Sequence, residues 1–171
     1  MRPTNEQRRT ALTDAAIDVV IRAGLHGLSH LAVDEAANLP RGTTSNYFRS
    51  RDALLEAMTR RLMELHFALM KEHLAEKPDR QGLIESLSAI LEHALTEYRG
   101  RYLAMLELAL EGTRDPETRR GIAGVINEAM NLTYEVHGAD IQIPAKDVQL
   151  LSVFYNGLLF TWTVMPEILA G

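Results

Sequence analysis

Residues 29–51 read Ser-His-Leu-Ala-Val-Asp-Glu-Ala-Ala-Asn-Leu-Pro-Arg-Gly-Thr-Thr-Ser-Asn-Tyr-Phe-Arg-Ser-Arg. Ser29 is a favourable N-cap for a short helix, because its hydroxyl can accept a hydrogen bond from an amide of the first turn. Asn38 tolerates the left-handed conformation in which helices often end. Pro40 suits the first turn of a second helix, where its missing N–H costs nothing. The stretch therefore predicts two short helices joined by a tight turn.

The second of these helices has little apolar surface. Its polar residues are Thr43, Thr44, Asn46 and Tyr47. Only Phe48 is suited to anchor it in a core. Short hydroxyl and amide side chains can reach bases and phosphates from a helix that lies in the major groove of DNA. The arginines that flank the helix, and that can hold backbone phosphates, are Arg41, Arg49 and Arg51. An ordinary helical corner is the alternative to a DNA-binding helix-turn-helix.

A longer ordered pattern surrounds this stretch. It consists of Gly24, Gly27-Leu28-Ser29, Asp34-Glu35-Ala36-Ala37-Asn38-Leu39, Arg41-Gly42-Thr43, Tyr47-Phe48 and Ser50-Arg51-Asp52-Ala53-Leu54-Leu55. With this pattern the N-terminal third of the chain resembles the DNA-binding segment of the TetR (tetracycline-repressor) family of bacterial transcription regulators. The remainder is similar only in being helical and of suitable length. The commonest family residues are replaced at Asn38, Pro40, Thr44 and Ser45, so no operator sequence follows from the resemblance.

Three residues of this segment have a single expected role in binding double-stranded DNA. Arg51 and Tyr47 are expected to hold phosphates. Asn46 is expected to read adenine, whose major-groove edge an amide side chain can contact with two hydrogen bonds.

Other residues of the segment leave alternatives open. Thr43 and Thr44 face either phosphates or base edges, and Arg41 contacts either guanine or phosphate. Ser29 is expected to contact DNA as well as to cap its helix, and His30 beside it either touches backbone phosphate or lies exposed at the start of that helix.

Composition limits the other classes of function. The chain has 171 residues, 46% of them hydrophobic and 24% charged, and no cysteine, which excludes disulfides, thiolate zinc sites and cysteine nucleophiles. The six histidines lack zinc-ligand spacing, and no glycine-rich phosphate loop is present, so neither a metal nor a cofactor is expected. No apolar run reaches the length of a membrane helix. A cytoplasmic protein with no membrane partner is expected.

Charge is distributed unevenly along the chain. Residues 1–61 contain nine arginines and seven acidic residues, which gives a net charge of +2. The net charge of the whole chain is −5, so residues 62–171 have a net charge of −7. This asymmetry is typical of a DNA-binding head attached to a separate acidic body.

Apolar periodicity predicts an all-α fold. The expected helices span residues 6–23, 51–77, 80–98, 101–112, 116–137 and 145–169, in addition to the two short ones. Gly24 and Gly100 are expected to end or break helices. We expect a three-helix head with the helix-turn-helix in residues 1–50 and a ligand-binding and dimerisation body in residues 51–171. The helix over 51–77 carries two apolar stripes and is expected to link them.

The last helix is apolar on more sides than one body can cover, and Gly157 would allow another backbone to approach closely. This pattern indicates a subunit interface. The family resemblance implies a homodimer formed through the last two helices, about 116–137 and 145–169. Such a dimer would place two heads on a pseudo-palindromic operator.

The resemblance also implies that a small-molecule effector controls DNA binding. Methionine and aromatic residues of the body could line its pocket, since such surfaces adapt to irregular apolar ligands. The candidates are Met63, Phe67, Met70, Tyr98, Tyr102, Met105, Met130, Tyr134, Phe154 and Trp162. Plain core packing is the alternative for each of them. The carboxylates Glu107 and Glu111 lie one helical turn apart on the same face of a helix. They could form part of a solvated face, orient a ligand, or act as an acid–base couple.

These patterns predict a sequence-specific transcriptional regulator, a repressor that a small, largely apolar effector releases from its operator. One alternative is a regulator of the same fold that acts as an activator or responds to a protein partner. A small helical enzyme is a more distant alternative, and no catalytic residues are expected.

Overall fold

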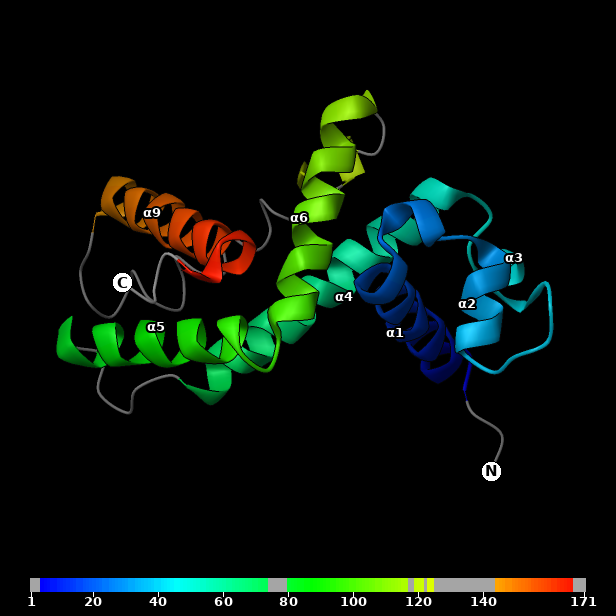
Figure 1. Ribbon diagram of the computed structural model, residues 1–171, viewed down its shortest axis with the longest axis horizontal. Coiled ribbons are helices and arrows are strands. Elements are labelled where there is room, and N and C mark those ends of the chain that lie inside the picture. Colours follow the sequence, from blue (N-terminus) through cyan, green and yellow to red (C-terminus); the bar gives the residue numbers. More distant parts are fainter. Residues whose placement is uncertain (1–3, 74–79, 117–118, 122, 125–143, 168–171) are drawn as a thin grey trace. The chain divides into compact units, whose positions relative to one another are not determined.

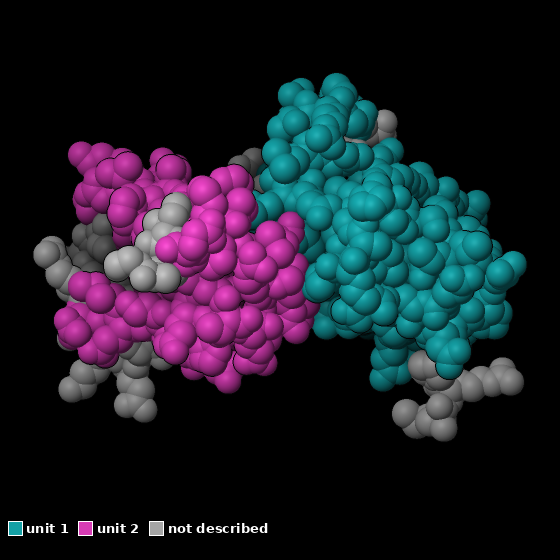
Figure 2. Space-filling model, viewed as in Figure 1, with its two compact units in different colours: residues 1–62, 104–125 teal, residues 63–103, 126–171 magenta. Residues whose placement is uncertain are grey.

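The computed structural model describes residues 4–73, 80–116, 119–121, 123–124 and 144–167 (Figure 1). Within these ranges every regular element is a helix, which confirms the predicted all-α fold. The chain forms two compact units, residues 1–62 with 104–125 and residues 63–103 with 126–171 (Figure 2). This division differs from the expected boundary near residue 50, because the first half of α4 (Arg51–Glu72) packs into the core of the N-terminal helices.

Helix α1 (Asn5–Ala23) confirms the prediction for residues 6–23. Thr4 caps its N-terminus by a reciprocal pair of hydrogen bonds with Gln7, of 2.9 and 3.2 Å. Gly24 ends the helix as predicted, with φ of +68°, a conformation that glycine adopts without strain. Its apolar residues Leu12, Ala15, Ala16, Val19 and Val20 are buried, whereas Ala11 is exposed.

The helix-turn-helix follows a short 3-10 helix, η1 (Leu25–Gly27), and consists of α2 (His30–Ala36) and α3 (Thr43–Tyr47). Ser29 caps α2 by accepting a hydrogen bond from the amide of Ala32 at 3.1 Å, and Asn38 is left-handed with φ of +52°. Both predictions are confirmed. The expectation for Pro40 is wrong: it lies in the turn, and Gly42, with φ of +88°, precedes the first residue of α3.

The core of the first unit joins all the N-terminal helices to α4 and α6 (Arg99–Arg114). Phe48 and Leu55 are almost completely buried, and Ala104 and Leu108 of α6 complete the cluster. At its edge, Arg61 of α4 donates hydrogen bonds to the carboxylate of α1 residue Asp14, the shorter at 2.8 Å. This packing fixes the helix-turn-helix on a rigid base.

The second unit contains α5 (Arg80–Leu95) and α9 (Ala145–Val164), which pack against each other, with the adjoining parts of α4 and α6. A small cluster of Leu69, Met70 and Ile90 lies at its centre. Gly100 was expected to break the chain between helices but lies in the first turn of α6. The chain turns earlier, where the amide of Tyr98 donates to the carbonyl of His93 at 2.9 Å. Most of the helix predicted over 116–137, and the end of that predicted over 51–77, lie outside the described residues.

Candidate nucleic-acid interface

A buried carboxylate fixes the turn between α2 and α3. Asp34 of α2 is 1% exposed and accepts hydrogen bonds from the amides of Gly42 and Thr44, both at 2.7 Å, and from the Thr44 hydroxyl at 2.5 Å. Glycine at the start of α3 offers no side-chain cap, so Asp34 supplies the acceptor for its first amides from the preceding helix. The carboxylate therefore sets the angle at which α3 leaves the turn.

The environment of Asp34 favours its charged form. Burial by itself raises the pKa of the Asp34 carboxyl, but the hydrogen bonds from the Thr44 side chain and from the turn amides outweigh that effect. The pKa of the Asp34 carboxyl therefore lies below its ordinary value of 3.8, so the carboxylate is ionised at neutral pH.

The same bond removes Thr44 from the predicted DNA-contacting set. The Thr44 side chain is completely buried, and its hydroxyl donates a hydrogen bond to the Asp34 carboxylate. The expectation that Thr44 faces phosphates or base edges is therefore wrong in this conformation. Thr43 is half-buried, and its hydroxyl donates to the carbonyl of Pro40. On the outer face of α3, Ser45 and Asn46 are exposed, and Tyr47 is partly exposed.

Two further candidates near the turn, Arg41 and His30, lie in different environments. Arg41 is exposed and approaches Glu35 at 3.6 Å, a distance typical of a weak surface ion pair. The Nε2 atom of His30 is buried and has no hydrogen-bond partner within the described part of the chain, although the residue follows the capping Ser29 at the start of α2.

Arg51, the predicted phosphate contact at the start of α4, is held by α6. Its guanidinium donates to Glu111 Oε1 at 2.9 Å and to the carbonyl of Leu25 at 3.2 Å. One turn earlier on α6, Glu107 accepts the amide of Leu25 at 2.6 Å. The two carboxylates are thus neither a solvated face nor an acid–base couple: both bind the segment that carries the helix-turn-helix. Helical spacing placed them on one face, but no sequence signal identified their partners.

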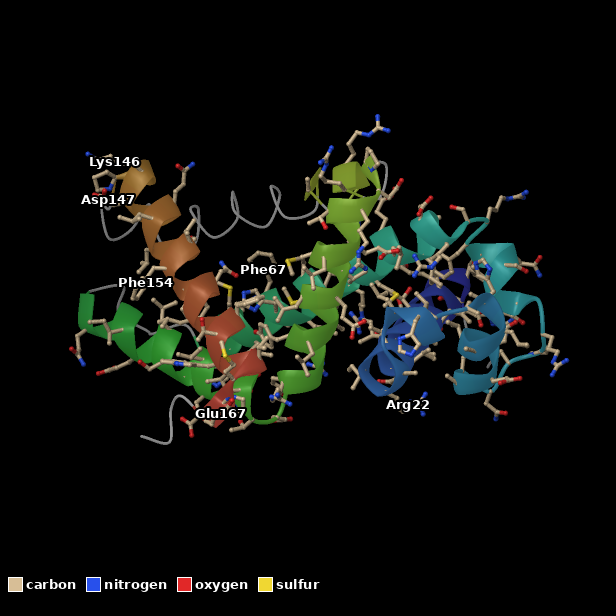
Figure 3. The ribbon with its side chains drawn as sticks, turned by 45° about the horizontal axis from the view of Figure 1, so that its top comes forward. Arg22, Phe67, Lys146, Asp147, Phe154 and Glu167 are labelled. Atoms are coloured by element: carbon tan, nitrogen blue, oxygen red, sulfur yellow. The ribbon has the colours of Figure 1, made fainter. Side chains whose placement is uncertain are left out.

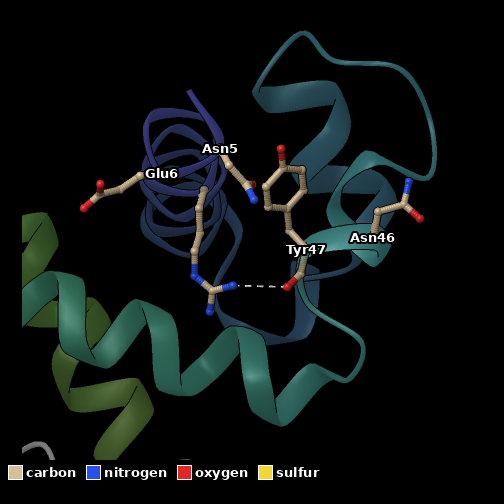
Figure 4. Close-up of a pocket in the computed structure, with 5 residues that line it drawn as sticks. Asn5, Glu6, Asn46 and Tyr47 are labelled. Carbon is tan, nitrogen blue, oxygen red and sulfur yellow. Dashed lines mark hydrogen bonds between the residues drawn. The ribbon is translucent and has the colours of Figure 1, made fainter. Parts of the chain in front are cut away.

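An open groove of about 670 Å³ lies between the N-terminal turns of α1 and the end of α3 (Figure 4). Asn5, Glu6 and Arg9 line it from α1, and Asn46 and Tyr47 line it from α3. Arg9 donates to the carbonyl of Tyr47 at 3.2 Å, and its guanidinium carbon lies 4.5 Å from the centre of the Phe48 ring. None of the three α1 residues was among the predicted DNA contacts.

The second unit brings some of the predicted pocket residues together. Phe67, Met70 and Tyr98 belong to its central cluster, which Tyr155 of α9 also contacts. Tyr102 is buried and hydrogen-bonded to His66, with 2.7 Å between its hydroxyl and Nδ1. The hydroxyl of Tyr155 is buried with no hydrogen-bond partner among the described residues. Neither His66 nor Tyr155 was predicted to be part of a site.

Other predicted pocket residues lie elsewhere. Met105 packs against the core of the first unit, and Phe154 is 65% exposed on α9. Both expectations are corrected, because Met105 faces the core of the first unit and Phe154 lies on an exposed face of α9. Met63 and Trp162 are partly buried, whereas Met130 and Tyr134 lie outside the described residues.

Burial keeps His66 neutral, lowering its pKa from 6.5 to about 4. An unfolded chain would bind a proton at this residue below pH 6.5, whereas the folded chain would not until about pH 4. The free energy of unfolding should therefore fall by about 3 kcal/mol as the pH is lowered through this window, at about 1.4 kcal/mol per pH unit. Urea denaturation across the pH range should show this slope in the wild type and a flatter one in His66→Gln.

A matched control for this measurement is His26→Gln, which makes the same substitution at an exposed histidine. Equal slopes for the two variants would mean that the environment of His66 does not depress its pKa.

The described residues contain no group of three or more metal-ligating side chains, and no helix among them is long and apolar enough to cross a membrane.

Two family profiles match the chain. The one described as "Bacterial regulatory proteins, tetR family" matches residues 12–58, and "Tetracyclin repressor-like, C-terminal domain" matches residues 78–169, more than half of the sequence. The regulator BetI of Burkholderia cenocepacia (strain HI2424) is 33% identical over 85 residues, which is 49% of this chain and 44% of that protein. The chain thus spans under half the length of this curated relative.

Solved structures agree over nearly the full length. A TetR family member from Streptomyces coelicolor A3 is 26% identical with a TM-score of 0.77, covering 94% of this chain and 89% of that one. The multidrug binding protein EbrR, solved with ethidium, is 26% identical with a TM-score of 0.75, covering 93% and 89%. This chain belongs to the TetR family of bacterial transcriptional regulators, and its N-terminal helices carry the DNA-binding helix-turn-helix of that family.

Proposed function

We propose that this protein is a repressor that binds a pseudo-palindromic operator as a homodimer and is released by a small, largely apolar effector. The observation that carries the proposal is the polar outer face of α3, held at a fixed angle by the Asp34 cap. Asn46 and Tyr47 are the side chains offered to DNA, with Thr43 and Arg41 at the start of the helix. Because the Asp34 cap fixes the orientation of α3, the side chains on its outer face keep a constant position relative to the bases of the major groove.

Helix α9 supports the dimer. Its exposed apolar residues Leu150, Val153, Phe154, Phe160 and Val164 are between 45 and 69% exposed. By helical geometry they share one face with Gly157, at which an added Cβ would meet nothing within 4 Å. In Figure 3, Phe154 projects from α9 between Lys146 and Asp147 at one end and Glu167 at the other. A continuous apolar stripe with charges at its ends is typical of a subunit interface.

The second unit supports an effector that carries rings. Phe67, Tyr98 and Tyr155 supply aromatic surface. The ring of His66 lies 5.8 Å from that of Phe67, whereas the guanidinium of Arg101 lies 4.3 Å from the centre of the Tyr98 ring. His66 has its pKa lowered to about 4 by burial, and burial also raises the pKa of Tyr102 and Tyr155. The Tyr155 hydroxyl, which has no hydrogen-bond partner among the described residues, is the group that a bound molecule would satisfy. EbrR, of similar fold, has been solved with imidazole, proflavin, ethidium and malachite green.

Helices α4 and α6 each contribute to both units, and we assign the coupling between effector and DNA to them. An effector can shift the protein only by its difference in affinity for the two states, with coupling of about 1–3 kcal/mol in typical cases. The contacts of α6 with Arg51 and Leu25 offer a route by which movement of α6 would reach the head.

Glu111→Gln is expected to strengthen DNA binding by about 2- to 5-fold per head, the range that a surface ion pair of up to 1 kcal/mol allows. In the wild type a phosphate must compete with Glu111 for the Arg51 guanidinium, and the variant weakens that competitor. Fluorescence anisotropy with operator DNA measures the change. The control is Glu92→Gln, which removes an equal charge from an exposed position of α5. Equal affinities for the two variants would mean that Arg51 does not contact DNA.

The function itself is tested by titrating salt against binding of the purified protein to random duplex DNA and to sites selected from a palindromic pool. We expect a steep negative dependence on salt and markedly tighter binding to the selected sites. Binding without sequence preference, or no binding at low salt, would contradict the proposal. Transcription from a reporter that carries the selected site then separates a repressor from an activator.

A further inference from the structure

The groove between α1 and α3 holds an arginine that the helix-turn-helix assignment does not use. Arg9 is exposed, yet its guanidinium is fixed twice, by the carbonyl of Tyr47 and by the ring of the buried Phe48. A cation placed over an aromatic ring is attracted by the negative charge of the ring's face. The side chain is therefore preorganised, unlike an arginine that moves freely in solvent.

Most of the donors of Arg9 remain available. A guanidinium has five N–H donors, and the Tyr47 carbonyl takes one of them. No carboxylate forms an ion pair with Arg9 within the part of the chain that the structure describes. A planar fork of unpaired donors is the geometry that binds the oxygens of a phosphate.

Neighbouring polar groups line the same groove. Figure 4 shows the side chain of Asn5 next to the ring of Tyr47, whereas Glu6 points away from that ring. An amide and a phenol hydroxyl are both common donors to DNA phosphates. Asn46, which lines the same groove, points away on the outer side of α3.

We propose that the groove is a DNA-backbone site, in which Arg9 of α1 binds one phosphate of the operator, while Asn5 and Tyr47 contact the backbone beside it. The inference rests on the proposed function, since it requires that α3 faces DNA. The proposal adds α1 to the DNA interface, so that each head would contact the DNA backbone through α1 as well as through the start of α4. Because Arg9 is bonded to the last residue of α3, the phosphate would also fix the position of that helix in the major groove.

The test compares the salt dependence of operator binding for the wild type, Arg9→Gln and Arg22→Gln. Arg22 lies at the other end of α1, so its variant is a control for the loss of one positive charge. Arg9→Gln should bind about 10-fold more weakly at 0.15 M salt and should lose about one unit of slope per head, or about two for a dimer. It should weaken binding to selected and random DNA alike, because phosphate contacts carry no sequence information.

Two further variants separate binding from a structural role. Arg9→Lys keeps the charge but lacks the fork, so it should retain most of the slope with reduced affinity. Glu6→Gln removes the one acidic residue of the groove and should bind more tightly than the wild type. The thermal midpoint of each variant is recorded in parallel.

If Arg9 only supports the end of α3, both Arg9 variants will lower the thermal midpoint and leave the salt slope at the Arg22→Gln value, which overturns the inference. If the wild type itself binds DNA without preference or without salt dependence, the proposed function fails instead. The two failures are therefore distinguishable.

Discussion

Asp34→Ala is expected to lower the free energy of unfolding by about 3 kcal/mol and to abolish specific DNA binding. The substitution removes the acceptor of three hydrogen bonds, which come from the amides of Gly42 and Thr44 and from the Thr44 hydroxyl. The Thr44 side chain is fully buried. Each buried donor that loses its partner costs about 1–3 kcal/mol, reduced where water or relaxation replaces the bond. Chemical denaturation and operator binding measure the two effects.

The pH dependence of this variant provides a second measurement. Because the folded pKa of Asp34 lies below 3.8, the carboxylate stabilises the fold above that pH and loses this contribution as the pH falls through the folded value. The difference between wild type and Asp34→Ala should therefore shrink in strongly acidic solution. Asp18→Ala, which removes an exposed carboxylate from α1, should change stability by less than about 0.5 kcal/mol at neutral pH. An equal loss in both variants would argue against the cap.

Phe154→Asp is expected to convert the dimer into monomers and to weaken operator binding by about 100-fold or more. An aspartate in the middle of the α9 stripe would be buried without a partner if two stripes packed together, which costs several kcal/mol. A monomer then loses the gain of about 10²–10⁴ that comes from joining two binding modules on one DNA. Sedimentation equilibrium and binding to a full operator measure the two effects.

The control for this variant is Ile84→Asp, which places the same charge at an exposed apolar residue of α5. It should leave both the mass and the operator affinity unchanged. If Phe154→Asp also remains dimeric, the subunits meet through another surface. If it becomes monomeric but retains full affinity for the operator, one head is enough for binding.

Local sequence determined the helices and the turn. Ser29, Asn38 and Gly24 act within a few residues of their own positions, as caps or as left-handed residues, so their roles could be predicted from residue type and spacing. The limits of α1 and the start of α9 followed from apolar periodicity in the same way. These features depend on interactions between chain neighbours, which a sequence states directly.

Tertiary structure decided which polar residues are available to bind. Thr44 looked like its neighbours in sequence, but its bond to Asp34, ten positions away, buries it. Arg51 donates a hydrogen bond to Glu111, sixty positions further along the chain, and the amide of Leu25 donates one to Glu107, eighty-two positions further along. Amphipathic spacing assigns a residue to a face of its helix but does not name the residue that the face will meet. The partners of these side chains, and with them the groove around Arg9, are therefore fixed only when the helices pack.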